Sequence, residues 1–129
     1  MFNTSVAVAL REGHANIIDR LETIDEPAFL SVLSVVELEG GVPLALEGVG
    51  LRRKKLDELY HDLTILDFTP VEAFAYRQII ALVGFSRSNI IDRMIAAQAI
   101  VAGATLATLN PRDFRNIPDL LVEDWSVGA

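Results

Sequence analysis

The sequence contains no cysteine and only two histidines among its 129 residues. Without cysteine the chain has no disulfide and no thiolate metal site. The two isolated histidines, His14 and His61, leave little for a zinc site or a Ser-His-Asp triad. Any metal that the chain binds is therefore expected to have oxygen ligands.

Long apolar runs are also missing from the sequence. No stretch approaches the ~20 apolar residues that a helix needs to span a bilayer. No basic segment precedes an apolar stretch at the amino terminus, as it would in a signal peptide. We therefore predict a cytoplasmic protein with no membrane partner. The length suits one hydrophobic core, so we predict a single domain over residues 1–129.

Positive charge is scarce, because 11 Lys and Arg residues against 18 Asp and Glu residues give a formal net charge of -7. This balance argues against broad electrostatic adhesion to nucleic acid or anionic lipid, so an RNA ligand would have to be held locally. The mean hydropathy of +0.36 is high for a small domain. It indicates apolar surface for a partner or a second copy of the chain.

Short apolar runs alternate with longer segments of helical period, as βα units do. The predicted fold class is α/β, with a short, mostly parallel central sheet of about five strands flanked by helices. Strands are predicted at residues 1–3, 28–33, 64–68, 104–109 and 120–123, and helices near residues 5–11, 14–24, 34–46, 56–63, 70–83 and 89–102.

Capping signals mark several helix ends. Ser34 and Glu37 have the spacing of a Ser-x-x-Glu capping box, and a second box begins at Thr69 with a proline at the first helical position. Ser88 is expected to cap the long helix that follows it, and Gly103 is placed to end that helix.

Polar residues recur where the predicted strands end. Asn3 follows the first strand, Glu37 the second, and Asn110 and Asp113 the fourth, while Asp92 opens the long capped helix. In open parallel sheets, ligands bind beyond the carboxyl ends of the strands. We therefore expect these side chains to converge on one edge of the sheet.

Clustered carboxylates repel one another unless a cation lies between them, so the pattern predicts a hard divalent metal. Mg²⁺ or Mn²⁺ suits oxygen ligands from Asn3, Glu37, Asp92 and Asp113, which we predict to be both the metal-binding and the catalytic residues. Such an ion activates water for phosphodiester hydrolysis without a side-chain nucleophile.

Further residues are predicted to support this site. Hydroxyl groups of Thr4 and Thr108 are placed to bond a water or an acidic ligand, and Asn110 to orient the site from outside the ligand shell. Arginines flank the acidic edge and can hold phosphate oxygens in a bidentate way. These phosphate-binding candidates are Arg87, Arg93 and Arg112.

Each acidic residue also has a simpler interpretation. Glu37 alone fits a helix cap, Asp92 alone fits a helix dipole, and Asp113 alone fits a turn. Their joint placement with Asn3 favours the metal site.

Four segments together resemble the successive motifs of VapC-type PIN domains over nearly the whole chain. They are Asn3-Thr4-Ser5-Val6, Ser34-x-x-Glu37-Leu38-x-x-Gly41, Asp92-x-x-Ile95-Ala96-Ala97 and Thr108-x-Asn110-x-x-Asp113-Phe114. The resemblance implies a PIN-like fold and a metal-dependent endoribonuclease toxin that forms a homodimer. It also implies tight inhibition by a small VapB-like antitoxin, through which alone the complex would contact DNA.

One position departs from the family pattern, because the family has Asp where this chain has Asn3. A neutral amide removes one negative charge from the site, and even losses outside the ligand shell cost ~10–100-fold in metal affinity or activity. We expect the chain to be attenuated at least this much. The residue is either natural to an impaired member or an introduced Asp→Asn change, and we favour the second.

Two other functions compete with the nuclease hypothesis. The first is a module that has lost its chemistry through Asn3 and only binds antitoxin or RNA. The second is a receiver-like phosphoacceptor, which needs a lysine at a late strand end. The only lysines are Lys54 and Lys55 within one helix, so we discount it. Neither the RNA that is cut nor the number of metals follows from the sequence.

Overall fold

The computed structural model describes residues 1–42 and 49–126, and it contains four short strands in two parallel pairs. The first pair joins β1 (Phe29–Ser31) to β2 (Thr64–Leu66), and the second joins β3 (Leu106–Thr108) to β4 (Val122–Asp124). All of the pairings are parallel, as the α/β prediction requires.

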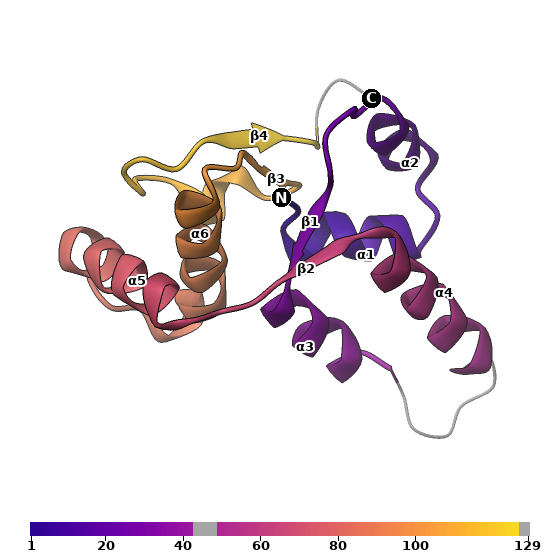
Figure 1. Ribbon diagram of the computed structural model, residues 1–129, viewed down its shortest axis with the longest axis horizontal. Helices are drawn as coiled ribbons and strands as arrows, with labels where there is room; N and C mark the ends of the chain where they lie inside the picture. The colour runs from indigo at the N-terminus through magenta and orange to yellow at the C-terminus, as the bar shows by residue number, and fades with distance from the viewer. Residues whose placement is uncertain (43–48, 127–129) are drawn as a thin grey trace.

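Phe2 connects the two pairs into one layer. It forms parallel bridges with Leu30 on one side and with Ala107 on the other. The order across the layer is therefore β2, β1, Phe2, β3 and β4 (Figure 1). The predicted α/β class is confirmed, whereas the five-strand count is seen only in part, because the first strand is reduced to the bridges at Phe2.

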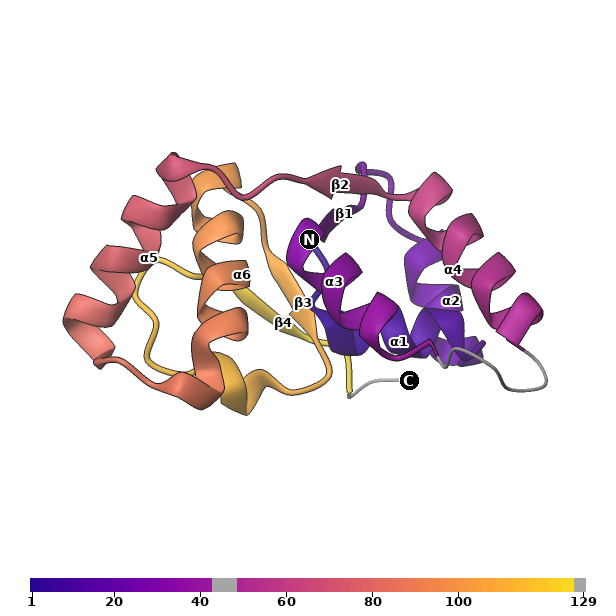
Figure 2. The ribbon, with the colours of Figure 1, turned by 90° about the horizontal axis from the view of Figure 1, so that it is seen from below.

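Helices cover both faces of this layer. In both views α5 and α6 lie on one side of the strands, and α1, α2 and α4 lie on the other (Figures 1 and 2). None of the helices within the described ranges is long and apolar enough to cross a bilayer. The helices are α1 (Thr4–Arg11), α2 (Ala15–Glu22), α3 (Val32–Gly40), α4 (Val49–Asp62), α5 (Pro70–Val83) and α6 (Ile90–Ala102), with 3-10 turns at Arg87–Asn89 and Pro111–Phe114.

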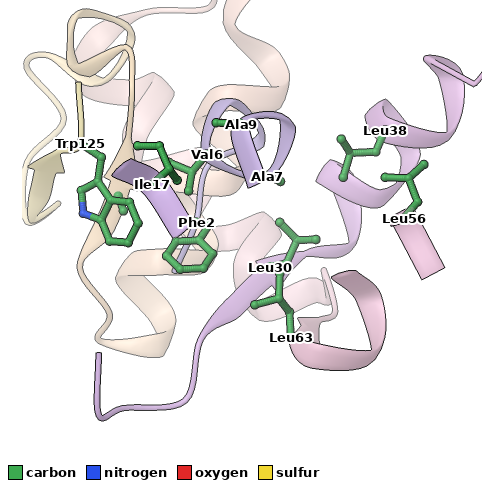
Figure 3. Close-up of a cluster of buried hydrophobic side chains, with 11 residues drawn as sticks. Phe2, Val6, Ala7, Ala9, Ile17, Leu30, Leu38, Leu56, Leu63 and Trp125 are labelled. Atoms are coloured by element: carbon green, nitrogen blue, oxygen red, sulfur yellow. The ribbon is translucent and has the colours of Figure 1, made fainter. Parts of the chain in front are cut away.

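Two hydrophobic clusters hold the helices against the strands. The first contains Phe2, Val6, Leu30 and Leu56, and Trp125 packs edge-on against the Phe2 ring with the ring centroids 5.2 Å apart (Figure 3). The second lies on the α5–α6 side and is made by Met1, Ile79, Ile95, Leu106 and Phe114. Consecutive residues of the amino terminus therefore enter the two clusters.

The start of α3 corrects one predicted cap. The helix begins at Val32, and the Ser31 hydroxyl accepts a hydrogen bond from the Leu33 amide at 2.9 Å. Ser34 lies inside the helix and bonds to Thr4, so the predicted capping box at Ser34 is wrong. The helix ends at Gly40, and most of its predicted extension to residue 46 lies outside the described residues.

Of the other predicted helix ends, those at Thr69 and Gly103 are confirmed and the one at Ser88 is wrong. The box at Thr69 is confirmed, with its hydroxyl accepting from the Val71 amide at 3.2 Å and Glu72 reaching back to the Thr69 amide. Gly103 ends α6 with a φ of 64°, in the left-handed region that glycine tolerates. The Ser88 cap is wrong, because Ser88 sits within a 3-10 turn that precedes α6.

Gln98 ties α6 to both β1 and β2. Its side chain is 2% exposed, and its amide nitrogen donates to the carbonyl oxygens of Leu66 and Asp67 at 3.1 and 3.0 Å. Its carbonyl oxygen accepts from the Ser31 hydroxyl, which also caps α3. One buried amide thus fixes where α3 begins relative to α6.

Replacing Gln98 with alanine should lower the free energy of unfolding by about 2–4 kcal/mol, because it leaves a cavity and removes the hydrogen bonds of Gln98 to Ser31, Leu66 and Asp67. Gln78→Ala on the exposed face of α5 is the matched control, with an expected change within about 0.5 kcal/mol. Urea denaturation measures both values. Equal losses in the two variants would show that the Gln98 network contributes nothing to stability.

Candidate active site

Asn3 occupies the centre of the carboxyl edge of the strand layer. Its amide nitrogen in the backbone donates to the Ala107 carbonyl at 2.9 Å, and its side chain is 4% exposed. The side-chain nitrogen donates to the hydroxyls of Thr108 and Ser5 at 3.0 and 3.2 Å. The side-chain oxygen is buried and makes no hydrogen bond within the described part of the chain. A buried acceptor without a donor is costly, so this oxygen is suited to a ligand.

Thr4 connects this edge to Glu37. The Thr4 hydroxyl donates to one carboxylate oxygen of Glu37 at 2.7 Å and lies 2.8 Å from the Ser34 hydroxyl. Thr4 begins α1, and both of its partners belong to α3. The contact therefore holds the Glu37 carboxylate beside the residue that follows Asn3.

Asp92 lies in the first turn of α6 and is half-buried. Burial raises the pKa of its carboxyl group to about 6, and the negative charges of Asp113 and Glu37 act in the same direction. Because the charges of Asp113 and Glu37 act on Asp92, the three carboxylates share one region of the surface. This is the predicted acidic edge, and it draws on α3, α6 and the turn after β3.

The carboxylates of the described residues do not lie close enough together to form a complete metal-binding site. Within residues 1–42 and 49–126, no group of three or more His, Cys, Asp or Glu side chains is placed to hold a metal ion. Glu37 and Asp113 are exposed, and the buried residue of the set is the neutral Asn3. The arrangement brings the predicted residues to one edge, and their roles as ligands stay a prediction.

The predicted supporting residues have different surroundings. Thr108 is fully buried, and its hydroxyl accepts from the side chain of Asn3 and from the Asn110 amide at 3.0 Å. The Asn110 residue itself is exposed. Thr108 therefore holds the Asn3 side chain in place from the buried side of the site.

The three arginine candidates also differ. The Arg93 guanidinium donates one hydrogen bond to the Gly84 carbonyl at the end of α5, and its phosphate role stays a prediction. Arg87 and Arg112 are exposed in the two 3-10 turns. Their contact with phosphate stays a prediction.

Ser5 is a site residue to which sequence reasoning gave no role. Its hydroxyl accepts from the side chain of Asn3 and from the Leu109 amide at 3.1 Å. It thus links the first turn of α1 to the end of β3. The signal available in the sequence was its place directly after Asn3 and Thr4 in the first motif.

With this geometry in place, comparison with known proteins identifies the family. A family model for the PIN domain matches residues 1–120. The chain is 30% identical over 131 residues to the ribonuclease VapC2 of Rickettsia felis, covering 97% of this chain and 96% of that protein. The chain belongs to the PIN-domain family, and within it to the VapC-type proteins.

Solved structures agree with this assignment. The VapBC2 complex of Rickettsia felis, bound to a DNA fragment from its promoter, contains a chain that is 28% identical, with a TM-score of 0.85 over 97% of each chain. The DNA-bound VapBC complex of Salmonella typhimurium contains another, 25% identical, with a TM-score of 0.84 over 97% of this chain and 96% of that one. The predicted PIN-like fold is confirmed.

The raised pKa of Asp92 predicts a pH-dependent stability. A carboxyl group with a higher pKa in the folded state than in the unfolded state stabilises the fold below about pH 4 and loses that contribution as the pH rises through about 6. Asp92→Asn should therefore raise the free energy of unfolding at pH 7.5 by about 1 kcal/mol, well under the value of the full shift because the side chain still meets solvent.

Thermal and urea unfolding at pH 4 and pH 7.5 measure this effect, with Asp19→Asn on the exposed face of α2 as the matched control. The gain from Asp92→Asn should be larger at pH 7.5 than at pH 4, whereas the control should show no such difference. A loss of stability at pH 7.5 in Asp92→Asn alone would contradict the repulsion among the three carboxylates.

Proposed function

We propose that this chain is the endoribonuclease toxin of a toxin–antitoxin pair and hydrolyses RNA phosphodiesters at the acidic edge. The observation that carries the proposal is the buried side-chain oxygen of Asn3, which has no hydrogen-bond partner among residues 1–42 and 49–126. The next residue, Thr4, donates a hydrogen bond to Glu37. The negative charge of Glu37 in turn acts on the carboxyl group of Asp92. The similarity to a ribonuclease VapC2 over nearly the whole chain supports the same activity.

The donor set suits Mg²⁺ or Mn²⁺, because all of its atoms are amide or carboxylate oxygens. Asn3, Glu37, Asp92 and Asp113 are the residues that would hold the ion. When bound, the ion supplies activated water and neutralises charge on the phosphate. The protein contributes orientation, since Thr4 fixes Glu37, and Thr108 and Ser5 fix residue 3.

Asn3 attenuates this activity. An amide offers one neutral oxygen where a carboxylate offers a negative charge to the metal. An Asp in the same place can accept hydrogen bonds from both Ser5 and Thr108, because their hydroxyl groups rotate to donate. The pocket around residue 3 therefore accommodates a carboxylate without rearrangement.

The partners proposed for this chain are RNA, a VapB-like antitoxin and a second copy of the chain in a homodimer. DNA would be contacted only through the antitoxin. Apolar side chains for such contacts lie exposed on and after α5, where Phe74, Leu82 and Phe85 are 63%, 70% and 66% exposed. Exposed apolar surface of this kind usually marks a partner interface.

The alternative is a module that binds antitoxin or RNA without cutting it. The neutral Asn3 at the centre of the edge is the observation that favours it. The two functions differ in what Asp at position 3 would do, because restored charge revives an enzyme and leaves a binding module inactive.

A cleavage assay on mixed RNA distinguishes the enzyme from the binding module. It compares the parent chain, Asn3→Asp, and Asn3→Asp combined with Asp92→Ala, each with Mn²⁺ and with chelator. We expect Asn3→Asp to exceed the parent chain by at least ~10–100-fold and to need the metal. Asp92→Ala should abolish the gain. Asn16→Asp, which adds the same charge on exposed α2, is the control and should cut no faster than the parent.

Cleavage by no variant under any condition would remove the nuclease proposal and favour the binding module. Metal binding has its own readout, because a ligand that binds only the folded state raises the unfolding temperature. Mn²⁺ should raise that temperature more in Asn3→Asp than in Asn16→Asp.

A further inference from the structure

A second group of charged side chains lies outside the acidic edge, in a cleft between α1 and α4. The cleft has a volume of about 230 Å³ and is lined by Arg11, Glu12, Leu51, Arg52 and Lys55. Three cations and one carboxylate give it an excess of positive charge, in a chain whose formal net charge is -7. We call it the Arg11–Arg52 cleft.

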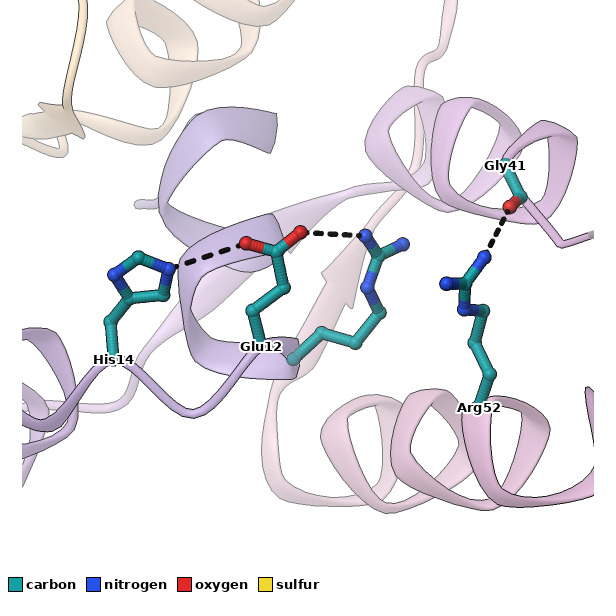
Figure 4. A network of polar contacts seen from close by, with 5 residues as sticks. Glu12, His14, Gly41 and Arg52 are labelled. Carbon is teal, nitrogen blue, oxygen red and sulfur yellow. Dashed lines mark hydrogen bonds and ion pairs between the residues drawn. The ribbon is translucent and has the colours of Figure 1, made fainter. Parts of the chain in front are cut away.

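The two arginines converge on Gly41. The Arg52 guanidinium donates to the Gly41 carbonyl at 3.3 Å (Figure 4), and a Cβ atom added to Gly41 would lie 3.9 Å from a guanidinium nitrogen of Arg11. Glu12 approaches Arg11 at 3.5 Å and is shared with His14 at 3.2 Å. A guanidinium has five N–H donors, more than these long contacts use within the described part of the chain.

The neighbouring Arg53 is committed elsewhere. It makes a bidentate contact with Glu39 at 2.6 and 2.5 Å and pairs with Asp57 at 3.3 Å, and Tyr60 also donates to Glu39 at 2.9 Å. The basic residues Arg52, Arg53 and Lys55 of α4 therefore lie on different faces of the helix. Arg53 joins α4 to α3, while Arg52 and the Lys55 beside it face the cleft.

Two helices connect the cleft to the acidic edge. Glu37 on α3 and Gly41, which caps the end of that helix, are four residues apart and therefore lie on the same side of it. On α1, Thr4 holds Glu37 at the first turn, and Arg11 is the last residue of the helix. Seven residues of α-helix rise by about 10 Å. Along α1, the cleft therefore lies about 10 Å from the residue that bonds Glu37.

We propose that the Arg11–Arg52 cleft holds a backbone phosphate of the RNA strand whose scissile phosphodiester lies at the acidic edge. This inference rests on the proposed nuclease function. A separation of about 10 Å is short enough for one RNA strand to reach both the cleft and the acidic edge with neighbouring nucleotides. Paired guanidinium forks suit phosphate oxygens. Their positive charge also offsets the repulsion between the acidic edge and the RNA backbone. The cleft therefore provides local attraction for RNA in a chain whose net charge is negative.

The test is the affinity of the full chain for fluorescein-labelled, mixed-sequence single-stranded RNA, measured by anisotropy in chelator over a series of salt concentrations. The cleft variant is Arg11→Gln with Arg52→Gln. The matched control, Lys54→Gln with Arg77→Gln, removes the same charge from exposed positions outside the cleft. We expect the cleft variant to bind about tenfold more weakly than the control, with a salt slope smaller by ~0.7 for each phosphate that the cleft no longer binds.

Equal affinities of the cleft variant and the control would overturn the inference while leaving the nuclease proposal standing. The inference would also fall if the cleft variant bound RNA as the control does but had a weaker affinity for the antitoxin, since the cleft would then hold an acidic protein segment. Failure of the parent to bind RNA, with no cleavage by Asn3→Asp, would remove both proposals. If the cleft variant unfolds, Arg52→Gln with Lys55→Gln applies the same comparison without touching α1.

Discussion

The structure depends on the insertion of the first residues between two pairs of strands. The Phe2 amide donates to the Phe29 carbonyl at 2.8 Å, the Asn3 amide to the Ala107 carbonyl at 2.9 Å, and the Ala107 amide to the Met1 carbonyl at 2.8 Å. These bonds join the pairs into one layer and start α1 at the next residue. The backbone that closes the sheet is therefore the backbone that holds the candidate site, and neither can shift without the other.

Much of the fold could be predicted from local signals. The box at Thr69 and the glycine at Gly103 were identified because proline, acidic and glycine preferences act within a few residues. The start of α3 could not be predicted in this way, because Ser34 with Glu37 has the stronger capping signal in sequence, whereas the structure uses Ser31. The choice between them is made by tertiary contacts, since the Gln98 amide engages one serine and Thr4 engages the other.

The site was predictable to the extent that strand ends share an edge of the sheet. That rule predicts that Glu37, Asp92 and Asp113 lie near one another, and burial together with the charges of Asp113 and Glu37 raises the pKa of Asp92. The rule does not predict side-chain direction around a helix, and so it does not predict the hydrogen bond from Arg93 to the Gly84 carbonyl. It is also silent on whether carboxylates meet closely enough to hold an ion unaided. Asn3 at this edge is buried and neutral, and its side-chain oxygen accepts no hydrogen bond from the residues that the structure describes. An Asp at this position would add a negative charge to the edge.

We propose that the acidic edge binds a divalent metal ion and that an Asp at position 3 would complete the negative charge of this site. Anomalous diffraction from crystals of Asn3→Asp grown with Mn²⁺ tests it most directly. We expect a manganese peak within about 2.3 Å of carboxylate oxygens of residue 3 and Asp92, and a weaker peak or none in crystals of the parent chain. A manganese ion bound only at other residues, or no ion at this edge in Asn3→Asp, would contradict the account.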